Sequence, residues 1–207
     1  MAHLILVRHG QSEWNKLGKW TGYVDVGLTE KGIEEAKKAG QALKGFSIDR
    51  VFTSALKRAH ETYVAMRDVL GIPHEPVQHA ALNERHYGVL TGLNKWEAQK
   101  QMGEAEFQRI RRGWDSEIEG GETLKDVHAR VVPYYTENIL PELKSGKSVL
   151  IVAHGNSLRA LVKHLENVSE EAIPLLEIAT GEVYCYAVDG NGVCVEKRIL
   201  TTKDIAP

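Results

Sequence analysis

The chain has 207 residues, enough to bury one full hydrophobic core, and we expect a single domain over residues 1–207. Its 26 Lys and Arg residues are balanced by 28 Asp and Glu residues, so the overall charge excludes general nucleic-acid binding, and any anion site must be local. No apolar stretch is long enough to cross a bilayer, no leader-like segment is visible, and Cys185 and Cys194 make no disulfide framework, so we expect a reduced, cytoplasmic protein without a membrane partner.

The first predicted element is a buried strand. Residues 4–7 are apolar at every position and lead into His9, a pattern typical of a parallel strand that carries polar groups at its C-terminal end. A helix follows with Thr29 as its predicted N-cap. Its apolar face is predicted to include Ile33, Ala36, Ala39 and Leu43.

A second strand and helix come next. Residues 48–52 read as a short strand, and Thr53 with Ser54 predicts the N-cap of a helix that runs to about Leu70 and ends at Gly71. The chain therefore begins with a β-α-β-α arrangement.

The middle of the chain is predicted to be helical. Residues 94–112 have a helical composition, and Gly103 predicts a break between two helices. Residues 122–144 read as a long helix. Pro133 lies inside it, so the helix is expected either to kink there or to consist of two segments.

The last part returns to the sheet. Residues 147–152 form another strand, apolar at every position from Val149 to Val152, which ends before His154 and leads into a helix through Leu165. Residues 182–188 and 193–200 alternate polar and apolar side chains around Asp-Gly-Asn-Gly, which predicts a hairpin. The expected fold is a three-layer α/β/α sandwich with a mainly parallel sheet and an antiparallel strand from this hairpin.

Two histidines, each followed by glycine, come at the ends of two of these strands. Ligands of open α/β sheets collect beyond the carboxyl ends of the strands, so His9 and His154 are expected to share one site. Either one alone, among nine histidines, would more simply be a surface or core residue. The equivalent placement of both favours a site.

Arginines accompany these histidines. Arg8 precedes His9, and Arg58 comes at the start of the second helix, where backbone amides also favour anions. Guanidinium groups stay charged and match phosphate in shape, although Arg58 alone would more simply be an exposed helix charge. A neutral imidazole between such cations keeps a lone pair with which to attack phosphorus, while the neighbouring groups stabilise the transferring charge.

A metal site is the alternative use of these histidines. His9, His86 and His154 would be its ligands. Arginines rather than carboxylates accompany them, and neither an HExxH nor a CxxC motif occurs, so we expect no metal.

The motifs resemble a known family over almost the whole chain, from His3 to about Leu200. LVRHGQSEWN at residues 6–15, together with His154, resembles the signature of the histidine phosphatase superfamily. Further segments are similar to the 2,3-bisphosphoglycerate-dependent phosphoglycerate mutases within it, namely LNERHYG at 82–88, LTGLNK at 90–95, Arg111-Arg112, and AHGNSLR at 153–159.

This resemblance implies a phosphoglycerate mutase-like fold and an enzyme of glycolysis and gluconeogenesis that interconverts 3-phosphoglycerate and 2-phosphoglycerate. It implies that the partner is a small anionic phosphorylated substrate and that 2,3-bisphosphoglycerate is the phosphoryl primer. His9 would carry the phosphoryl group as phosphohistidine, and Glu84 would donate and accept the proton on the substrate oxygen. The phosphoryl group would be held by Arg8, Arg58 and His154, helped by Asn15 and the Gly155 amide.

The resemblance also implies a set of residues for the rest of the substrate, which are Ser12, Thr21, Gly22, Arg85, Tyr87, Lys95, Arg111, Arg112 and Asn156. Read without the resemblance, Glu84 is equally a surface carboxylate paired with Arg85, and the Arg111-Arg112 pair is equally a solvated helix end.

Two segments depart from the family pattern. Residues 113–121 lead directly to the next helix where the family usually has a longer, proline-containing excursion, and the tail after Leu200 is brief. A shorter lid excludes water from phosphohistidine less well, and it leaves a monomer and a homo-oligomer equally open. The alternative function is therefore a phosphatase of the same superfamily that hydrolyses small phosphate monoesters. An inactive sensing or scaffolding protein is disfavoured because His9, Glu84 and His154 are all present.

Overall fold

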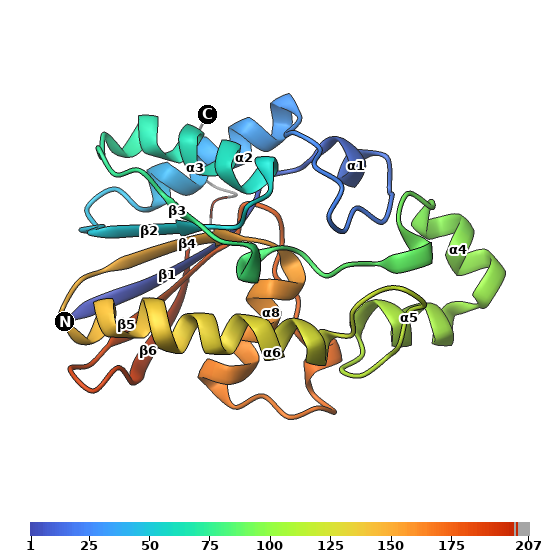
Figure 1. The fold of residues 1–207 in the computed structure, drawn as a ribbon. Coiled ribbons are helices and arrows are strands. Elements are labelled where there is room, and N and C mark those ends of the chain that lie inside the picture. Colours follow the sequence, from blue (N-terminus) through green and yellow to red (C-terminus); the bar gives the residue numbers. More distant parts are fainter. Residues whose placement is uncertain (201, 203–207) are drawn as a thin grey trace.

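A mixed β-sheet forms the centre of the protein in this computed structural model, which describes residues 1–200 and 202 (Figure 1). Across the sheet the strand order is β3-β2-β4-β1-β5-β6. The first four of these are parallel, and the β5–β6 hairpin adds the antiparallel pairs, which confirms the predicted sheet. The strands are β1 (Ala2–Arg8), β2 (Arg50–Thr53), β3 (Val77–Gln78), β4 (Val149–Ala153), β5 (Val183–Val188) and β6 (Cys194–Leu200). The short β3 was not predicted.

The register of the parallel strands brings their carboxyl ends to one edge. Val7 of β1 lies opposite Val152 of β4, and the amide of His9 donates to the carbonyl of Ala153 at 3.0 Å. The residues that follow both strands are therefore side by side, as the sequence predicted.

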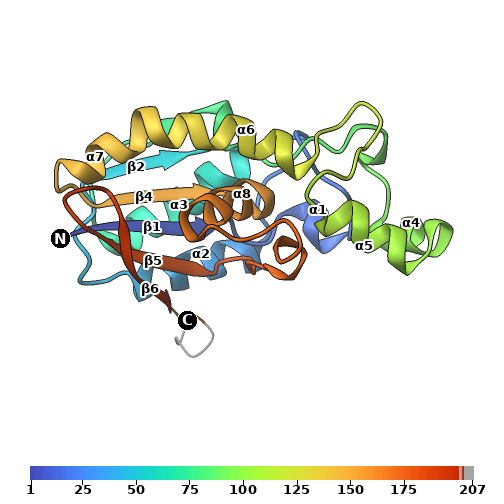
Figure 2. The same cartoon turned by 90° about the horizontal axis from the view of Figure 1, so that it is seen from below.

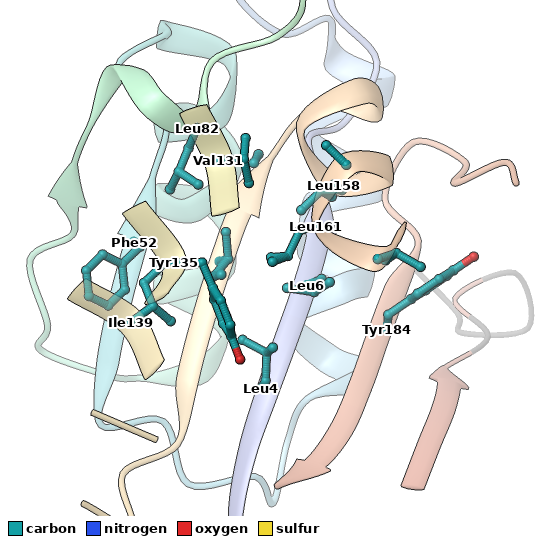
Figure 3. Close-up of a cluster of buried hydrophobic side chains, with 14 of the residues drawn as sticks. Leu4, Leu6, Phe52, Leu82, Val131, Tyr135, Ile139, Leu158, Leu161 and Tyr184 are labelled. Carbon is teal, nitrogen blue, oxygen red and sulfur yellow. The ribbon is translucent and has the colours of Figure 1, made fainter. Parts of the chain in front are cut away.

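Helices cover both faces of the sheet, which confirms three layers (Figures 1 and 2). On one face α2 (Glu30–Ala42) and α3 (Lys57–Leu70) pack against the side chains of Ile5, Val7 and Leu150. On the other face α6 (Leu124–Tyr134) and α8 (Gly155–Glu166) pack against the alternate side chains of these strands. Figure 3 shows this second core, to which Leu4, Leu6, Val131, Leu158 and Leu161 belong.

The start of α2 matches its prediction, but its buried face does not match completely. The Thr29 side chain accepts a hydrogen bond from Gly32 N, and Ala36, Ala39 and Leu43 are buried. Ile33, however, is 39% exposed. The helix packs through its small residues, including Gly32 and Gly40, so the buried stripe is rotated away from Ile33.

The predicted N-cap of α3 is wrong. Thr53 is the last residue of β2, and the helix begins at Lys57 after Leu56, which makes no side-chain cap. Ser54 is buried at the sheet edge instead. The predicted end is confirmed, since Gly71 takes a left-handed conformation with φ of 66°.

The remaining helices lie beyond the sheet edge or complete the second layer. Gly103 separates α4 (Lys95–Met102) from α5 (Glu104–Arg112), as predicted. Pro133 lies within α6, which continues from Tyr135 through a π-helical turn and then α7, so of the two expected outcomes the structure shows separate segments, whose first boundary comes after Pro133. The shorter elements are α1 (Glu13–Lys16), η1 (Ala80–Leu82), η2 (Gly88–Leu90), η3 (Tyr135–Ile139), α7 (Leu140–Lys144) and η4 (Ile173–Leu175). Within residues 1–200 and 202, no helix combines the length and the apolar character that a membrane crossing needs.

Gly10 and Gly32 bring two backbone segments into direct contact just after His9. A Cβ atom on Gly10 would lie 2.1 Å from Gly32 O, and one on Gly32 would lie 2.1 Å from Gln11 O. Neither position has room for a side chain. The first turn of α2 is thereby fixed against the segment that leaves β1.

Candidate active site

A cavity of about 80 Å³ opens at the carboxyl edge of the sheet, and side chains from α1, α4 and α5 also line it. One water needs about 10–15 Å³ of such space, so the cavity has room for a larger group. Most of the residues predicted for the site line it. The lining consists of Arg8, His9, Asn15, Trp20, Thr21, Arg58, Glu84, Tyr87, Lys95, Arg111, Arg112, Gly155, Asn156, Arg159, Glu177 and Ile178.

Four predicted residues lie behind this lining. Ser12 caps α1 and exchanges hydrogen bonds with Asn15, and the Gly22 carbonyl accepts from Arg58 Nη2 at 2.8 Å. Arg85 donates to the carbonyl of Ile110 at 2.9 Å, so the structure places it as a support and not in the cavity wall. The fourth is His154, which is fully buried next to His9.

The His9 ring is held with one nitrogen committed to the backbone. Its Nδ1 lies 2.7 Å from the carbonyl oxygen of Gly10. A carbonyl only accepts hydrogen bonds, so Nδ1 carries the proton and Nε2 has the free lone pair. Burial lowers the pKa of His9 well below its ordinary value, and the charges of Arg58 and Arg8 lower it further. The ring is therefore neutral at neutral pH and can act as a nucleophile.

His154 faces His9 from the end of β4. The two ring centroids are 4.9 Å apart, and His154 Nε2 lies 2.6 Å from Ser54 Oγ. Burial, followed by Arg58 and His9, lowers the pKa of His154 well below its ordinary value. Ser54 thus orients the second imidazole, a role that the sequence reasoning missed. Its position at the end of the neighbouring parallel strand is the signal that could have found it.

Arg8 and Arg58 are both fixed by backbone carbonyls. Arg8 Nη1 donates to Ile178 O at 2.5 Å, and Arg58 Nη1 donates to Val24 O at 3.0 Å. The buried Nε atoms of both arginines, like His154 Nδ1, have no hydrogen-bond partner among the described residues. Buried polar atoms are nearly always paired, so this cluster indicates a place for an anion with several acceptor oxygens.

Glu84 is a buried acid in this cationic wall. Its Oε1 accepts hydrogen bonds from the amides of Arg85 at 2.8 Å and Asn156 at 3.1 Å. Its Oε2 lies toward Gly155, 3.7 Å from where a Cβ atom of that residue would be. Burial raises the pKa of Glu84, but the Arg85 amide and the charges of Arg8 and Arg58 outweigh it, and the net pKa is below the ordinary value. Glu84 is therefore a carboxylate before an anion binds.

The outer wall holds more cations, contributed by α4 and α5. Burial lowers the pKa of Lys95 to about 8, and nearby Arg111 and Arg8 add to this effect. Burial also lowers the pKa of Arg111, which adjoins Arg112. Among the described residues, no three His, Cys, Asp or Glu side chains are grouped so that they could hold a metal ion.

Arg159 was not predicted, yet it braces this wall. Its guanidinium donates to Leu176 O at 3.0 Å, Asn156 Oδ1 at 2.9 Å, Arg112 O at 2.7 Å and Ile173 O at 2.8 Å. It lies in the AHGNSLR segment, whose resemblance was the signal available in the sequence. Glu177, also not predicted, pairs with Arg112 at 2.6 Å.

Comparisons with known proteins show the family of the chain. The model of the histidine phosphatase superfamily (branch 1) matches residues 4–200. A 2,3-bisphosphoglycerate-dependent phosphoglycerate mutase of Parvibaculum lavamentivorans is 48% identical over 204 residues, which cover 97% of each chain. A phosphoglycerate mutase of Schizosaccharomyces pombe is 46% identical over 200 residues, which cover 95% of each chain. The solved structure of a mycobacterial glucosyl-3-phosphoglycerate phosphatase with VO3 has a TM-score of 0.79 at 25% identity, covering 96% of this chain and 97% of that chain.

The pKa of Lys95 makes anion binding depend on pH. Because the Lys95 ammonium loses its proton near pH 8, the cavity loses one positive charge between pH 7 and pH 9. We expect the affinity for sulfate, which does not titrate in this range, to fall about two- to fivefold over that interval. Calorimetric titration of the protein with sulfate measures it. In Lys95→Met binding should be weaker and should no longer change over this range, and an unchanged pH dependence in that variant would assign the effect to another group.

Proposed function

The chain belongs to the histidine phosphatase superfamily, and we propose that it interconverts 3-phosphoglycerate and 2-phosphoglycerate through a phosphoryl group carried on His9. The observation that carries the proposal is the neutral His9 imidazole, with a free Nε2, beside buried arginine donors that have no partner among the described residues. Two curated phosphoglycerate mutases at 46% and 48% identity over nearly the whole chain support the substrate.

The residues present fit 2,3-bisphosphoglycerate as the primer. Its phosphates and carboxylate would be held by Arg8 and Arg58 inside and by Lys95, Arg111 and Arg112 outside. When bound, it supplies the phosphoryl group that first loads His9. The unpaired donors of the inner arginines are the part of the site that fits a phosphate.

His9 and its neighbours divide the transfer between nucleophile and charge stabilisation. Nε2 attacks phosphorus, and the N–P bond forms as the P–O bond to the leaving oxygen breaks. Arg8 and Arg58, which line the cavity, and His154, whose buried Nδ1 has no partner among the described residues, would stabilise the oxygens of the transferring group. The amide of Gly155 lies at the first turn of α8, where anions are favoured. In the return step, the substrate hydroxyl attacks phosphorus and the N–P bond breaks.

Glu84 moves the proton that balances these steps. It gives a proton to the leaving oxygen as the N–P bond forms, and it takes the hydroxyl proton when the N–P bond breaks. A bound phosphoryl group offsets the charges of Arg8 and Arg58, which otherwise hold the pKa of Glu84 down. The carboxyl group can therefore hold a proton while phosphate is present and release it afterwards.

Loss of the nucleophile should abolish labelling. Incubation with radiolabelled 2,3-bisphosphoglycerate should give a label on the protein that is lost in acid and kept in base, as expected of phosphohistidine. His9→Ala should carry none, whereas the matched variant of an exposed histidine, His164→Ala, should be labelled like the unmodified chain. Label of the same kind on His9→Ala would reject the mechanism.

The proton step gives a separate prediction. Glu84→Gln keeps the size of the side chain and an oxygen to accept the amides of Arg85 and Asn156, but it cannot exchange a proton. We expect turnover to fall about 10²–10⁴-fold. Steady-state mutase assays measure turnover, and thermal unfolding checks that the variant is folded. Turnover within a factor of three of the unmodified chain would remove Glu84 from this role.

A phosphatase is the second candidate, because a mycobacterial phosphatase shares the fold and because residues 113–121 form a short connection. This connection is packed and not loose, since Ile118 joins Trp20, Tyr87 and Phe107 in a buried cluster. The cluster closes the wall next to Tyr87 and supports exclusion of water.

Comparing the two reactions distinguishes the candidates. On 3-phosphoglycerate with 2,3-bisphosphoglycerate present, we expect the mutase rate to exceed release of inorganic phosphate, because the outer cations retain a substrate with two anionic ends. A coupled assay for 2-phosphoglycerate run beside a phosphate-release assay measures both. A hydrolysis rate above the mutase rate would favour the phosphatase.

A further inference from the structure

Glu177 is an acid at the mouth of a cavity that otherwise collects positive charge. Of the side chains that line it, Arg8, Arg58, Lys95, Arg111, Arg112 and Arg159 are cationic, while Glu84 and Glu177 are the acids. Glu84 is buried and has a part in the proposed chemistry. Glu177 has none, and its side chain is 61% exposed.

The carboxylate of Glu177 is bound to one of the cations proposed for the substrate. Its Oε1 lies 2.6 Å from Arg112 Nη2, and the Arg112 side chain is only 16% exposed. The hydrogen bond to Arg112 lowers the pKa of Glu177, so this group is charged at neutral pH. A carboxylate in this position makes the contact that a carboxylate or phosphate of a ligand would make with the same guanidinium.

The backbone on both sides of this ion pair is fixed. Arg159 donates to the carbonyls of Leu176 and Arg112, and Arg8 donates to the carbonyl of Ile178. Tyr184 adds a hydrogen bond from its hydroxyl to the carbonyl of Glu177 at 3.2 Å. The carbonyls of three consecutive residues are thus held by side chains, so Glu177 is presented to Arg112 from a rigid segment. An exposed ion pair usually loses part of its energy to ordering two side chains, and the burial of most of the Arg112 side chain reduces that loss.

We infer that Glu177 acts as an internal competitor for Arg112 and so sets how tightly the outer end of the substrate is bound. A ligand anion that reaches Arg112 must displace or share with the Glu177 carboxylate, and it also meets the negative charge of that carboxylate. An anion that stays at the inner end, between Arg8 and Arg58, avoids both effects. Glu177 therefore weakens the grip on a ligand with two anionic ends and favours its release. The inference rests on the proposed function in taking 3-phosphoglycerate as the ligand that spans both ends.

Replacing Glu177 by glutamine separates charge from shape. Glu177→Gln keeps an oxygen that can accept from Arg112, but it removes the negative charge. Calorimetric titration without 2,3-bisphosphoglycerate should show 3-phosphoglycerate binding about two- to fivefold more tightly than to the unmodified chain. The affinity for inorganic phosphate should change less than twofold, because phosphate is expected to bind at the inner end. The increase in affinity for 3-phosphoglycerate should be smaller in about 0.5 M NaCl, since salt screens the exposed charge of Glu177.

Glu170→Gln is the matched control. It removes the same charge from an exposed acid outside the cavity lining, and it should leave both affinities unchanged. Weaker or unchanged binding of 3-phosphoglycerate to Glu177→Gln would overturn the inference and assign Glu177 to orienting Arg112. An equal increase in affinity for inorganic phosphate and for 3-phosphoglycerate would also overturn the inference. The lost charge would then act on the whole cavity and not on Arg112 in particular. Absence of mutase activity in the unmodified chain would reject the proposed function, whereas these binding measurements would still decide the role of Glu177.

Discussion

The site depends on one constraint, which is that two imidazoles stay uncharged while guanidinium groups surround them. Burial makes the largest contribution to the lowered pKa values of His9 and His154, because a charged ring is unfavourable where water is excluded. Arg8 and Arg58 add to it, since a third positive charge beside them is disfavoured. The same two arginines that keep His9 neutral are the ones proposed to hold an anion in front of it. Nucleophile and electrophile are thus prepared by a single arrangement of charge.

The fold makes that arrangement possible at modest cost. Parallel register places the ends of β1 and β4 side by side, so both histidines follow directly from buried strands. Backbone carbonyls of Gly22, Val24 and Ile178 accept from the inner arginines and compensate for their burial. Main-chain oxygens therefore fix the guanidinium groups and leave their positive charge in place. A carboxylate partner would neutralise that charge.

Much of this was accessible from the sequence because it follows from local patterns. Continuous apolar runs predicted β1 and β4, the turn residues predicted the hairpin, and Gly103 predicted the break between α4 and α5. Local patterns also explain the errors. Thr53 and Ser54 have the chemistry of a helix cap, but the chain needs Ser54 at the sheet edge to hold His154. Ile33 fits a helical period, yet the close approach of small residues decides which side of α2 is buried.

The residues that sequence reasoning missed act over long separations. Arg159 connects the ends of α5 and η4, and Glu177 meets Arg112, 65 residues away. The spacing of these residues in the sequence does not indicate that they are in contact. Their contact depends on how α5 and the segment around η4 pack together beyond the sheet edge. Arg85 shows the converse case, since its position in a recognised motif predicted the cavity wall, whereas packing turns it behind Tyr87.

The paired glycines after β1 have a consequence for how such a protein can diversify. With Gly10 and Gly32 in backbone contact, the floor under His9 admits no new side chain and no shift of α2 relative to β1. The mouth carries no such restriction, because it is built from long side chains on α4, α5 and the segment around Glu177. New ligand preferences can therefore arise by exchanging residues at the rim, while the chemical step below is inherited unaltered.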